Sequence, residues 1–186
     1  MARSLLMGSL LLVLSLTTMS AQAEERLPFN ATFSGVLFST PFDTDGDGVP
    51  ANFNILEGQS NLGPFSLQVL DESVRAEPTT CPNGQAGFAV TLVAGSSVFR
   101  FRRTGDLLFV RPTSQTTCFD PITEVSFFRA ATGDIFGGTG RFANATGTIE
   151  GEGMARIFLS DRGGHVFGEQ HGTIEGIIIL PTLEVE

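Results

Sequence analysis

The chain has 186 residues, with twenty acidic residues against eleven arginines, and it contains no lysine, tyrosine or tryptophan. Without lysine and tyrosine, Schiff-base chemistry on a lysine and proton transfer by a tyrosine are excluded. The net charge of −9 repels phosphate backbones and anionic membrane surfaces, so we expect neither nucleic acid nor a membrane as a partner.

Residues 1–23 are typical of a secretory signal peptide. A basic start at Arg3 precedes an apolar run over residues 5–16, and Ala23 ends a small-x-small cleavage site. The apolar run is too short to span a bilayer comfortably, which argues against an uncleaved membrane anchor. We therefore expect a secreted or periplasmic protein whose mature chain, residues 24–186, forms one domain.

The first motif of the mature chain, DTDGDG, resembles the opening of a calcium-binding loop. Asp43, Asp45 and Asp47 stand on alternate positions and Gly48 follows, as in the first half of an EF-hand loop. Because Ca²⁺ prefers oxygen ligands at this spacing, the motif predicts a cation site that orders the loop.

The second half of the loop departs from that pattern. Its twelfth position is Asn54 instead of glutamate, and no helical periodicity flanks the loop. The candidates to complete a calcium shell are Asn52, the Val49 carbonyl and Glu57. Two interpretations stay open: a structural Ca²⁺ site, or a solvated acidic turn built from residues that turns favour. No organic cofactor is indicated.

Beyond this loop the sequence reads as β-strands nearly throughout, because turn residues recur at short spacing and no long helical period is present. We expect strands at residues 28–38, 52–59, 64–74, 86–94, 97–103, 107–112, 123–130, 146–159 and 164–180. Around the predicted turn at 104–106, Phe99 and Phe101 fall on one strand face and Arg100 and Arg102 on the other.

The two cysteines, Cys81 and Cys118, are predicted to form one disulfide in an oxidising compartment. Their wide separation in the sequence argues against a metal or redox site. The bond would join a predicted loop at 75–86 to residues 113–121.

The motif GTIEG occurs at 147–151 and again at 172–176. Small residues repeated on one face of a long strand suit a strongly coiled sheet. The strands could close into a barrel or stack as a sandwich. We favour a single antiparallel barrel of about eight strands, because closure removes the exposed edges of the sheet.

The run GDIFGGTGRFANATGTIEGEG at 133–153 resembles the GGTGRF…ATG signature of the allene oxide cyclase and dirigent group, and especially its uncharacterised secreted bacterial members. The matching residues are Gly137, Gly138, Thr139, Gly140, Arg141, Phe142, Ala145, Thr146 and Gly147. We expect the glycines to form a tight turn, Phe142 to close a barrel end, and a strand to begin at Thr146. The resemblance implies an antiparallel calycin-type barrel, often a homotrimer, that binds small hydrophobic molecules and steers their cyclisation or coupling.

Charged residues on two predicted strands are candidates for ligand binding. Glu150, Glu152 and Arg156 alternate onto one strand face. If that face points into the barrel, two crowded carboxylates and a guanidinium would line a pocket, and one carboxyl could act as a general acid. If it points outward, these residues form an ordinary solvated row.

A second group of cationic residues, Arg100, Arg102, Arg103 and Arg111, is concentrated around the predicted hairpin. Such a group could hold a ligand carboxylate. The alternative is that these arginines balance acidic neighbours at the surface.

The two histidines, His165 and His171, lie in the last strand region. His171 beside a carboxylate could serve as a base near neutral pH, but a zinc site would need a third ligand. Ser160 and Asp161 provide the residue types of a catalytic triad without a nucleophile elbow, so hydrolase chemistry is disfavoured.

Two functional hypotheses follow. The first is a secreted barrel that binds a small apolar or amphipathic molecule and steers its cyclisation or coupling. The second is a non-catalytic extracellular structural or interaction module, braced by calcium and one disulfide. A hollow interior with polar groups favours the first, whereas an interior filled by side chains favours the second.

Overall fold

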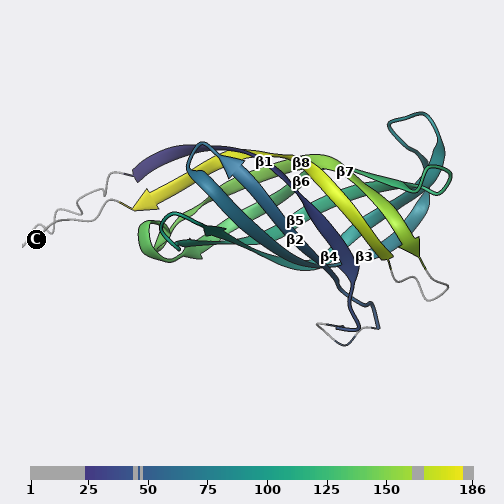
Figure 1. Ribbon diagram of the computed structural model, residues 1–186, viewed down its shortest axis with the longest axis horizontal. Helices are drawn as coiled ribbons and strands as arrows, with labels where there is room; N and C mark the ends of the chain where they lie inside the picture. Colours follow the sequence, from purple (N-terminus) through teal and green to yellow (C-terminus); the bar gives the residue numbers. More distant parts are fainter. Residues whose placement is uncertain (1–23, 44–45, 47, 161–165, 182–186) are drawn as a thin grey trace, which may run out of the picture.

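The structure is a computed structural model that describes residues 24–43, 46, 48–160 and 166–181. The described chain forms a closed barrel of eight antiparallel strands with one short 3₁₀ helix, η1 (Gly140–Phe142) (Figure 1). The strands are β1 (Glu24–Ser39), β2 (Asn52–Ser60), β3 (Gly63–Thr80), β4 (Ala86–Phe101), β5 (Leu107–Asp120), β6 (Val125–Gly138), β7 (Thr146–Ser160) and β8 (Val166–Pro181). Each strand pairs with the next, and β8 pairs with β1. The predicted all-β barrel is therefore confirmed over the sandwich.

The predicted signal peptide, residues 1–23, lies outside the described residues, so that interpretation stays a prediction. Within the part of the chain that the structure describes, no helix is long and apolar enough to cross a membrane.

Alternation of side chains explains how β1 forms one wall of the barrel. Phe29, Ala31 and Phe33 are buried inside, whereas Asn30 and Thr32 between them are exposed. This period of two is the pattern of a strand with one apolar and one solvated face. The sequence of β1 therefore fixes which face becomes the interior.

The two GTIEG copies lie side by side on β7 and β8, so that the glycine of one copy faces the isoleucine of the other. Two residues after the first copy, Gly153 pairs directly with Gly172, the first glycine of the second copy. A Cβ atom would lie 2.7 Å from the ring of Phe128 at the first glycine and 2.9 Å from the ring of Phe33 at the second. These two rings stack 6.3 Å apart. The paired glycines thus make room for aromatic packing.

Some strands differ from the prediction. The segments 86–94 and 97–103 belong to one continuous strand, β4, that ends at Phe101. Gly95 and Ser96, which resemble turn residues, pair with β3 inside this strand. Nine predicted strands therefore become eight.

The predicted loop at 75–86 is partly strand, because β3 continues to Thr80, and residues 113–120 belong to β5. Pro78 and Pro112 each stand next to a shift in strand register. A proline lacks the N–H that a regular ladder needs, and an irregularity in the ladder accommodates it. The proline positions indicated loops where the structure has irregular strands.

The predicted disulfide is confirmed: Cys81 and Cys118 are bonded, with Cα atoms 5.4 Å apart. The bond fastens the start of the β3–β4 connection to the end of β5. The predicted β4–β5 hairpin is also confirmed, since the Phe101 N–H donates to the Asp106 carbonyl at 2.9 Å and the Gly105 N–H donates to the Phe101 carbonyl at 2.8 Å.

One end of the barrel is filled by aromatic side chains. Fully buried rings come from β1, β3, β4 and η1: Phe29, Phe65, Phe99, Phe101 and Phe142. The last two rings lie 4.8 Å apart between centroids. Phe142 therefore closes this end as the signature predicted, and β7 begins at Thr146 as expected.

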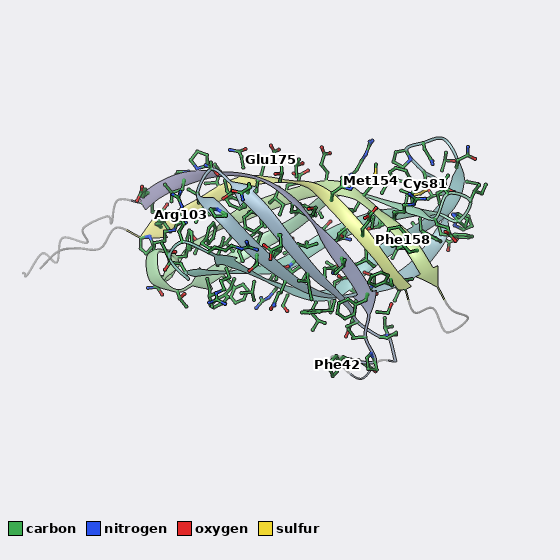
Figure 2. The ribbon with its side chains drawn as sticks, in the orientation of Figure 1. Phe42, Cys81, Arg103, Met154, Phe158 and Glu175 are labelled. Carbon is green, nitrogen blue, oxygen red and sulfur yellow. A yellow bond between two sulfur atoms is a disulfide. The ribbon has the colours of Figure 1, made fainter. Side chains whose placement is uncertain are left out.

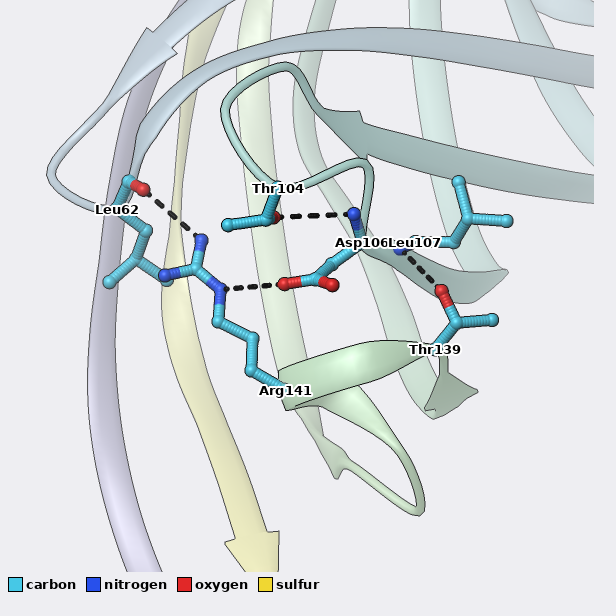
Figure 3. Close-up of polar contacts among 6 residues, drawn as sticks. All are labelled: Leu62, Thr104, Asp106, Leu107, Thr139 and Arg141. Atoms are coloured by element: carbon cyan, nitrogen blue, oxygen red, sulfur yellow. Dashed lines mark hydrogen bonds and ion pairs between the residues drawn. The ribbon is translucent and has the colours of Figure 1, made fainter.

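The arginine of the signature fastens this closed end (Figure 3). The Arg141 guanidinium donates to the Leu62 carbonyl at 3.1 Å and lies 3.6 Å from the Asp106 carboxylate. It also lies over the rings of Phe101 and Phe142, 4.9 and 4.6 Å from their centroids. One side chain thus links η1 to the β2–β3 and β4–β5 turns, which is a structural role.

Candidate ligand cavity in the barrel interior

Beyond the aromatic end, the barrel interior is hollow. An inner cavity of about 140 Å³ lies next to the phenylalanine cluster, and an outer cavity of about 320 Å³ reaches the first residues of β2 and β8. Apolar residues of the inner cavity include Phe33, Leu56, Leu67, Val110, Phe128 and Ile174. Apolar residues of the outer cavity include Leu37, Phe88, Val90, Phe119, Ile157 and Val166.

A polar belt, which we define as Asn54, Asp71, Ser73 and Gln170, lies where the two cavities meet. The Gln170 amide donates to Asn54 Oδ1 at 2.9 Å, and Asn54 Nδ2 donates to Asp71 Oδ1 at 2.8 Å. The Ser73 hydroxyl donates to Asp71 Oδ2 at 3.2 Å. The hydrogen bonds therefore converge on one interior carboxyl group.

The surroundings of Asp71 favour its neutral form. Burial raises the pKa of the Asp71 carboxyl above its ordinary value of 3.8, and the charge of Glu72 adds to the rise. Hydrogen bonds from Asn54, Ser73 and Asn52 lower the pKa, but burial is the larger effect. A carboxyl held in this way can donate a hydrogen bond or a proton to a ligand.

Sequence reasoning missed the polar belt, although a signal for it was present. On β3, Phe65, Leu67, Val69 and Asp71 occupy alternate positions, so the aspartate continues an inward-facing apolar row. On β2, Asn54 stands two residues from the buried Leu56 in the same way. A polar residue at a strand position that continues the inward-facing apolar row indicates an interior polar group.

The residues predicted to bind a ligand lie elsewhere. Glu150, Glu152, Arg156 and His171 are exposed on the outer face of β7 and β8, where the labelled Met154, Phe158 and Glu175 also project outward (Figure 2). The inward positions of β7 are occupied instead by small and apolar residues. The face of Glu150, Glu152 and Arg156 therefore points outward, as in the alternative of a solvated row, and ligand binding by these residues and by His171 stays a prediction.

Arg100 and Arg102 also point away from the interior, since they alternate with the buried Phe99 and Phe101. Arg102 forms an ion pair with Glu57 on the outer surface. Neither arginine lines the inner or the outer cavity.

The structure describes only part of the predicted calcium loop. The Asp43 carboxylate accepts hydrogen bonds from the N–H groups of Gly46 and Gly48, at 2.6 and 2.8 Å, while Asp45 and Asp47 lie outside the described residues. Across the described ranges, no group of three or more His, Cys, Asp or Glu side chains is placed to hold a metal ion. Calcium binding by Asp43, Asp45, Asp47, Val49 and Glu57 stays a prediction.

His165 and Asp161 also lie outside the described residues. His171 is exposed and pairs across the strands with Met154. His171 therefore lies on the outer surface of the barrel and lines neither cavity.

The fold and its interior define a closed, partly hollow eight-stranded barrel. No protein-family model matches the chain, and no curated protein matches it. Among solved structures, the chain is similar to the pterocarpan synthase dirigent protein GePTS1, with a TM-score of 0.46 and 12% identity over 92% of this chain and 99% of that chain. It is also similar to the pterocarpan synthase dirigent protein PsPTS1, with a TM-score of 0.38 and 14% identity over 87% of this chain and 97% of that chain.

Proposed function

We propose that the barrel binds a small apolar or amphipathic molecule inside its two cavities. The observation that carries the proposal is the polar belt, in which an interior carboxyl with a raised pKa stands between two apolar-walled spaces. Binding sites for small molecules combine apolar walls with a few polar groups in this manner. The ligand would enter at the end where β2 and β8 begin, because the other end is filled by phenylalanine rings.

The same geometry supports the finer proposal that the barrel steers a cyclisation or coupling of its ligand. A neutral Asp71 carboxyl can donate a proton to a leaving or carbonyl oxygen, and the apolar walls can restrict the conformations of the bound chain. In this proposal Asp71 is the proton donor, and the apolar walls set the conformation in which the ligand reacts.

A thermal unfolding scan of the purified protein with a panel of apolar and amphipathic molecules tests binding. A ligand that binds only the folded state raises the unfolding midpoint by mass action. Gln115 lines both cavities, whereas its neighbour Thr116 is exposed on the outer face. Gln115→Phe is expected to abolish the ligand-induced shift, and the matched control Thr116→Phe is expected to preserve it. Equal shifts in both variants would contradict interior binding.

A non-catalytic module is the second candidate, favoured by the filled aromatic end and by the Cys81–Cys118 bond. Calcium and chelator arms of the same scan test it. A midpoint that rises with calcium and with no ligand would support the braced module. Asp45→Asn is expected to remove a genuine calcium shift.

The homotrimer that the resemblance implies is a separate proposal, which the molar mass from light scattering tests.

A further inference from the structure

The inner cavity and the outer cavity differ in size and are separated by the polar belt, so the interior can discriminate between ligands by shape. The inner cavity, about 140 Å³, is close to the 150 Å³ of an engineered apolar protein cavity that binds benzene. It therefore has room for a single six-membered ring and not for a fused pair. The outer cavity, about 320 Å³, has room for a longer segment.

The charges of the interior discriminate as well. Asp71 is the one ionisable side chain among the described residues that line either cavity, and no arginine or histidine joins it there. An anionic ligand would lose its hydration without gaining a cationic partner, and that loss is costly in an apolar space. An uncharged amide, carbonyl or hydroxyl can exchange hydrogen bonds with the belt at a much smaller cost.

We infer that the interior takes an uncharged molecule with a single-ring apolar end, a hydrogen-bonding group near its middle and an apolar tail, and that it rejects carboxylates. The ring lies in the inner cavity, the polar group meets Asp71 and Asn54, and the tail lies in the outer cavity. This inference rests on the proposed function, whose ligand class it specifies. It also replaces the expectation that arginine side chains hold a ligand carboxylate.

Three probes with one skeleton test the inference by isothermal titration calorimetry at pH 7. They are 2-benzylhexanamide, the carboxylate 2-benzylhexanoate, and 2-(naphthylmethyl)hexanamide. We expect the benzyl amide to bind at least about tenfold more tightly than the carboxylate, because the carboxylate loses its hydration without gaining a cationic partner. We expect the naphthyl amide to bind at least about tenfold more weakly than the benzyl amide, because the fused ring exceeds the inner cavity.

Variants locate the ring. Ala131 lines the inner cavity, and Ala86 is exposed. Ala131→Leu is expected to weaken binding of the benzyl amide about tenfold, with no change for Ala86→Leu. Circular dichroism checks that both variants fold, and the comparison of probes on the unaltered protein needs no variant.

The outcomes separate the two proposals. If none of the probes binds, and no ligand of the wider panel binds, the proposed function fails and the inference fails with it. If ligands bind but the carboxylate equals the amide, or the naphthyl amide equals the benzyl amide, the inference is overturned while the proposed function stands.

Discussion

Asp71 carries its carboxyl inside the barrel, where burial favours the protonated form. Its pKa in the folded protein lies above the unfolded value, so the folded state binds the proton more tightly. The stability that this proton provides is present below about pH 4 and is lost as pH rises through the folded-state pKa. The interior carboxyl therefore lowers the stability of the barrel at neutral pH relative to acid.

Asp71→Asn is expected to remove this loss of stability at rising pH, because an amide stays neutral and its oxygen can still accept the hydrogen bond from Asn54 Nδ2. The free energy of unfolding of the variant should rise relative to the original protein between pH 4 and pH 7. Urea denaturation followed by circular dichroism measures it, since the chain has no tryptophan or tyrosine to report. Asp134→Asn, at an exposed position of β6, is the control and should show no such trend. A pH-independent difference for Asp71→Asn would contradict the prediction.

Gly140 in the signature is constrained twice. Its φ is +56°, which disfavours side chains, and a Cβ atom there would lie 1.9 Å from Asp106 Oδ1. Gly140→Ala should therefore lower the free energy of unfolding by about 2–4 kcal/mol. Gly105→Ala is a matched control, because that glycine has a φ of +77° but nothing within 4 Å of the added Cβ. Its expected loss is about 1 kcal/mol, and equal losses in the two variants would argue against the close approach.

At the scale of elements, the side chain of Asp120 joins the β3–β4 connection to the β5–β6 turn. Asp120 accepts hydrogen bonds from the Thr123 hydroxyl at 2.7 Å and from Asn83 Nδ2 at 2.8 Å, and the Ile122 N–H donates to it at 2.8 Å. These hydrogen bonds lower the pKa of Asp120 to about 2, and the bond from the Thr123 hydroxyl has the largest effect. The carboxylate thus fastens the β3–β4 connection to the β5–β6 turn.

This stabilisation is expected to depend on pH. A carboxyl with a lowered pKa contributes fully above its unfolded value near 4, and the contribution disappears as pH falls through about 2. Asp120→Asn should therefore lower the thermal midpoint at pH 5, and the difference from the original protein should shrink toward pH 2. A series of melts followed by circular dichroism from pH 2 to pH 5 measures this. A constant difference would mean that Asp120 acts through packing alone.

The disulfide also restrains the β3–β4 connection, which it fastens to the end of β5. Cys81 and Cys118 are separated by 37 residues, and the chain-entropy estimate for such a loop is about 4 kcal/mol as an upper value. Replacing both cysteines by serine should lower the free energy of unfolding by about 2–4 kcal/mol. Strand pairing around β1, β2, β7 and β8 does not involve the bond, so the far-ultraviolet circular dichroism should be unchanged. Loss of that spectrum would show that closure depends on the disulfide.

The sequence predicted those elements in which local rules agree. Phe99 and Phe101 alternate with arginines up to a glycine turn, so the β4–β5 hairpin was predictable. The extents of β3, β4 and β5 were not, because Gly95, Pro78 and Pro112 resemble breaks in isolation. They lie within strands since neighbouring strands pair around them. Tertiary pairing outweighs local propensity at such positions.

The interior site was less predictable for a different reason. From the sequence alone, either face of β7 could point into the barrel. One face carries small and aliphatic residues, and the other carries charged residues together with the apolar Met154 and Phe158. Which face points inward depends on the neighbouring strands, and that information is not local. Asp71 and Asn54 meet only because β2 and β3 pair in one register, with Asn54 opposite Val69. A shift of β2 by one residue along β3 would turn Asn54 outward and separate it from Asp71.

At the scale of the whole molecule, the barrel is divided between a solid end and a hollow end. Arg141 and the phenylalanine cluster stabilise the first, and the polar belt occupies the middle. The largest fully buried rings of the described chain pack at the solid end, so the walls of the hollow end contribute less to holding the strands together. We therefore expect variants of the cavity walls to change ligand preference at a small cost in stability.

Strand order also has a consequence for how the barrel is made. All pairings except one join strands that are neighbours in sequence, whereas β1 must find β8 at the opposite end of the described chain. Contacts of such long range form slowly, because the entropy of closing the intervening chain must be overcome first. Until then, β1 and β7 each present an open edge that can pair with other chains. During synthesis, seven strands therefore emerge before the barrel can close, and the protein is most prone to aggregate in that interval.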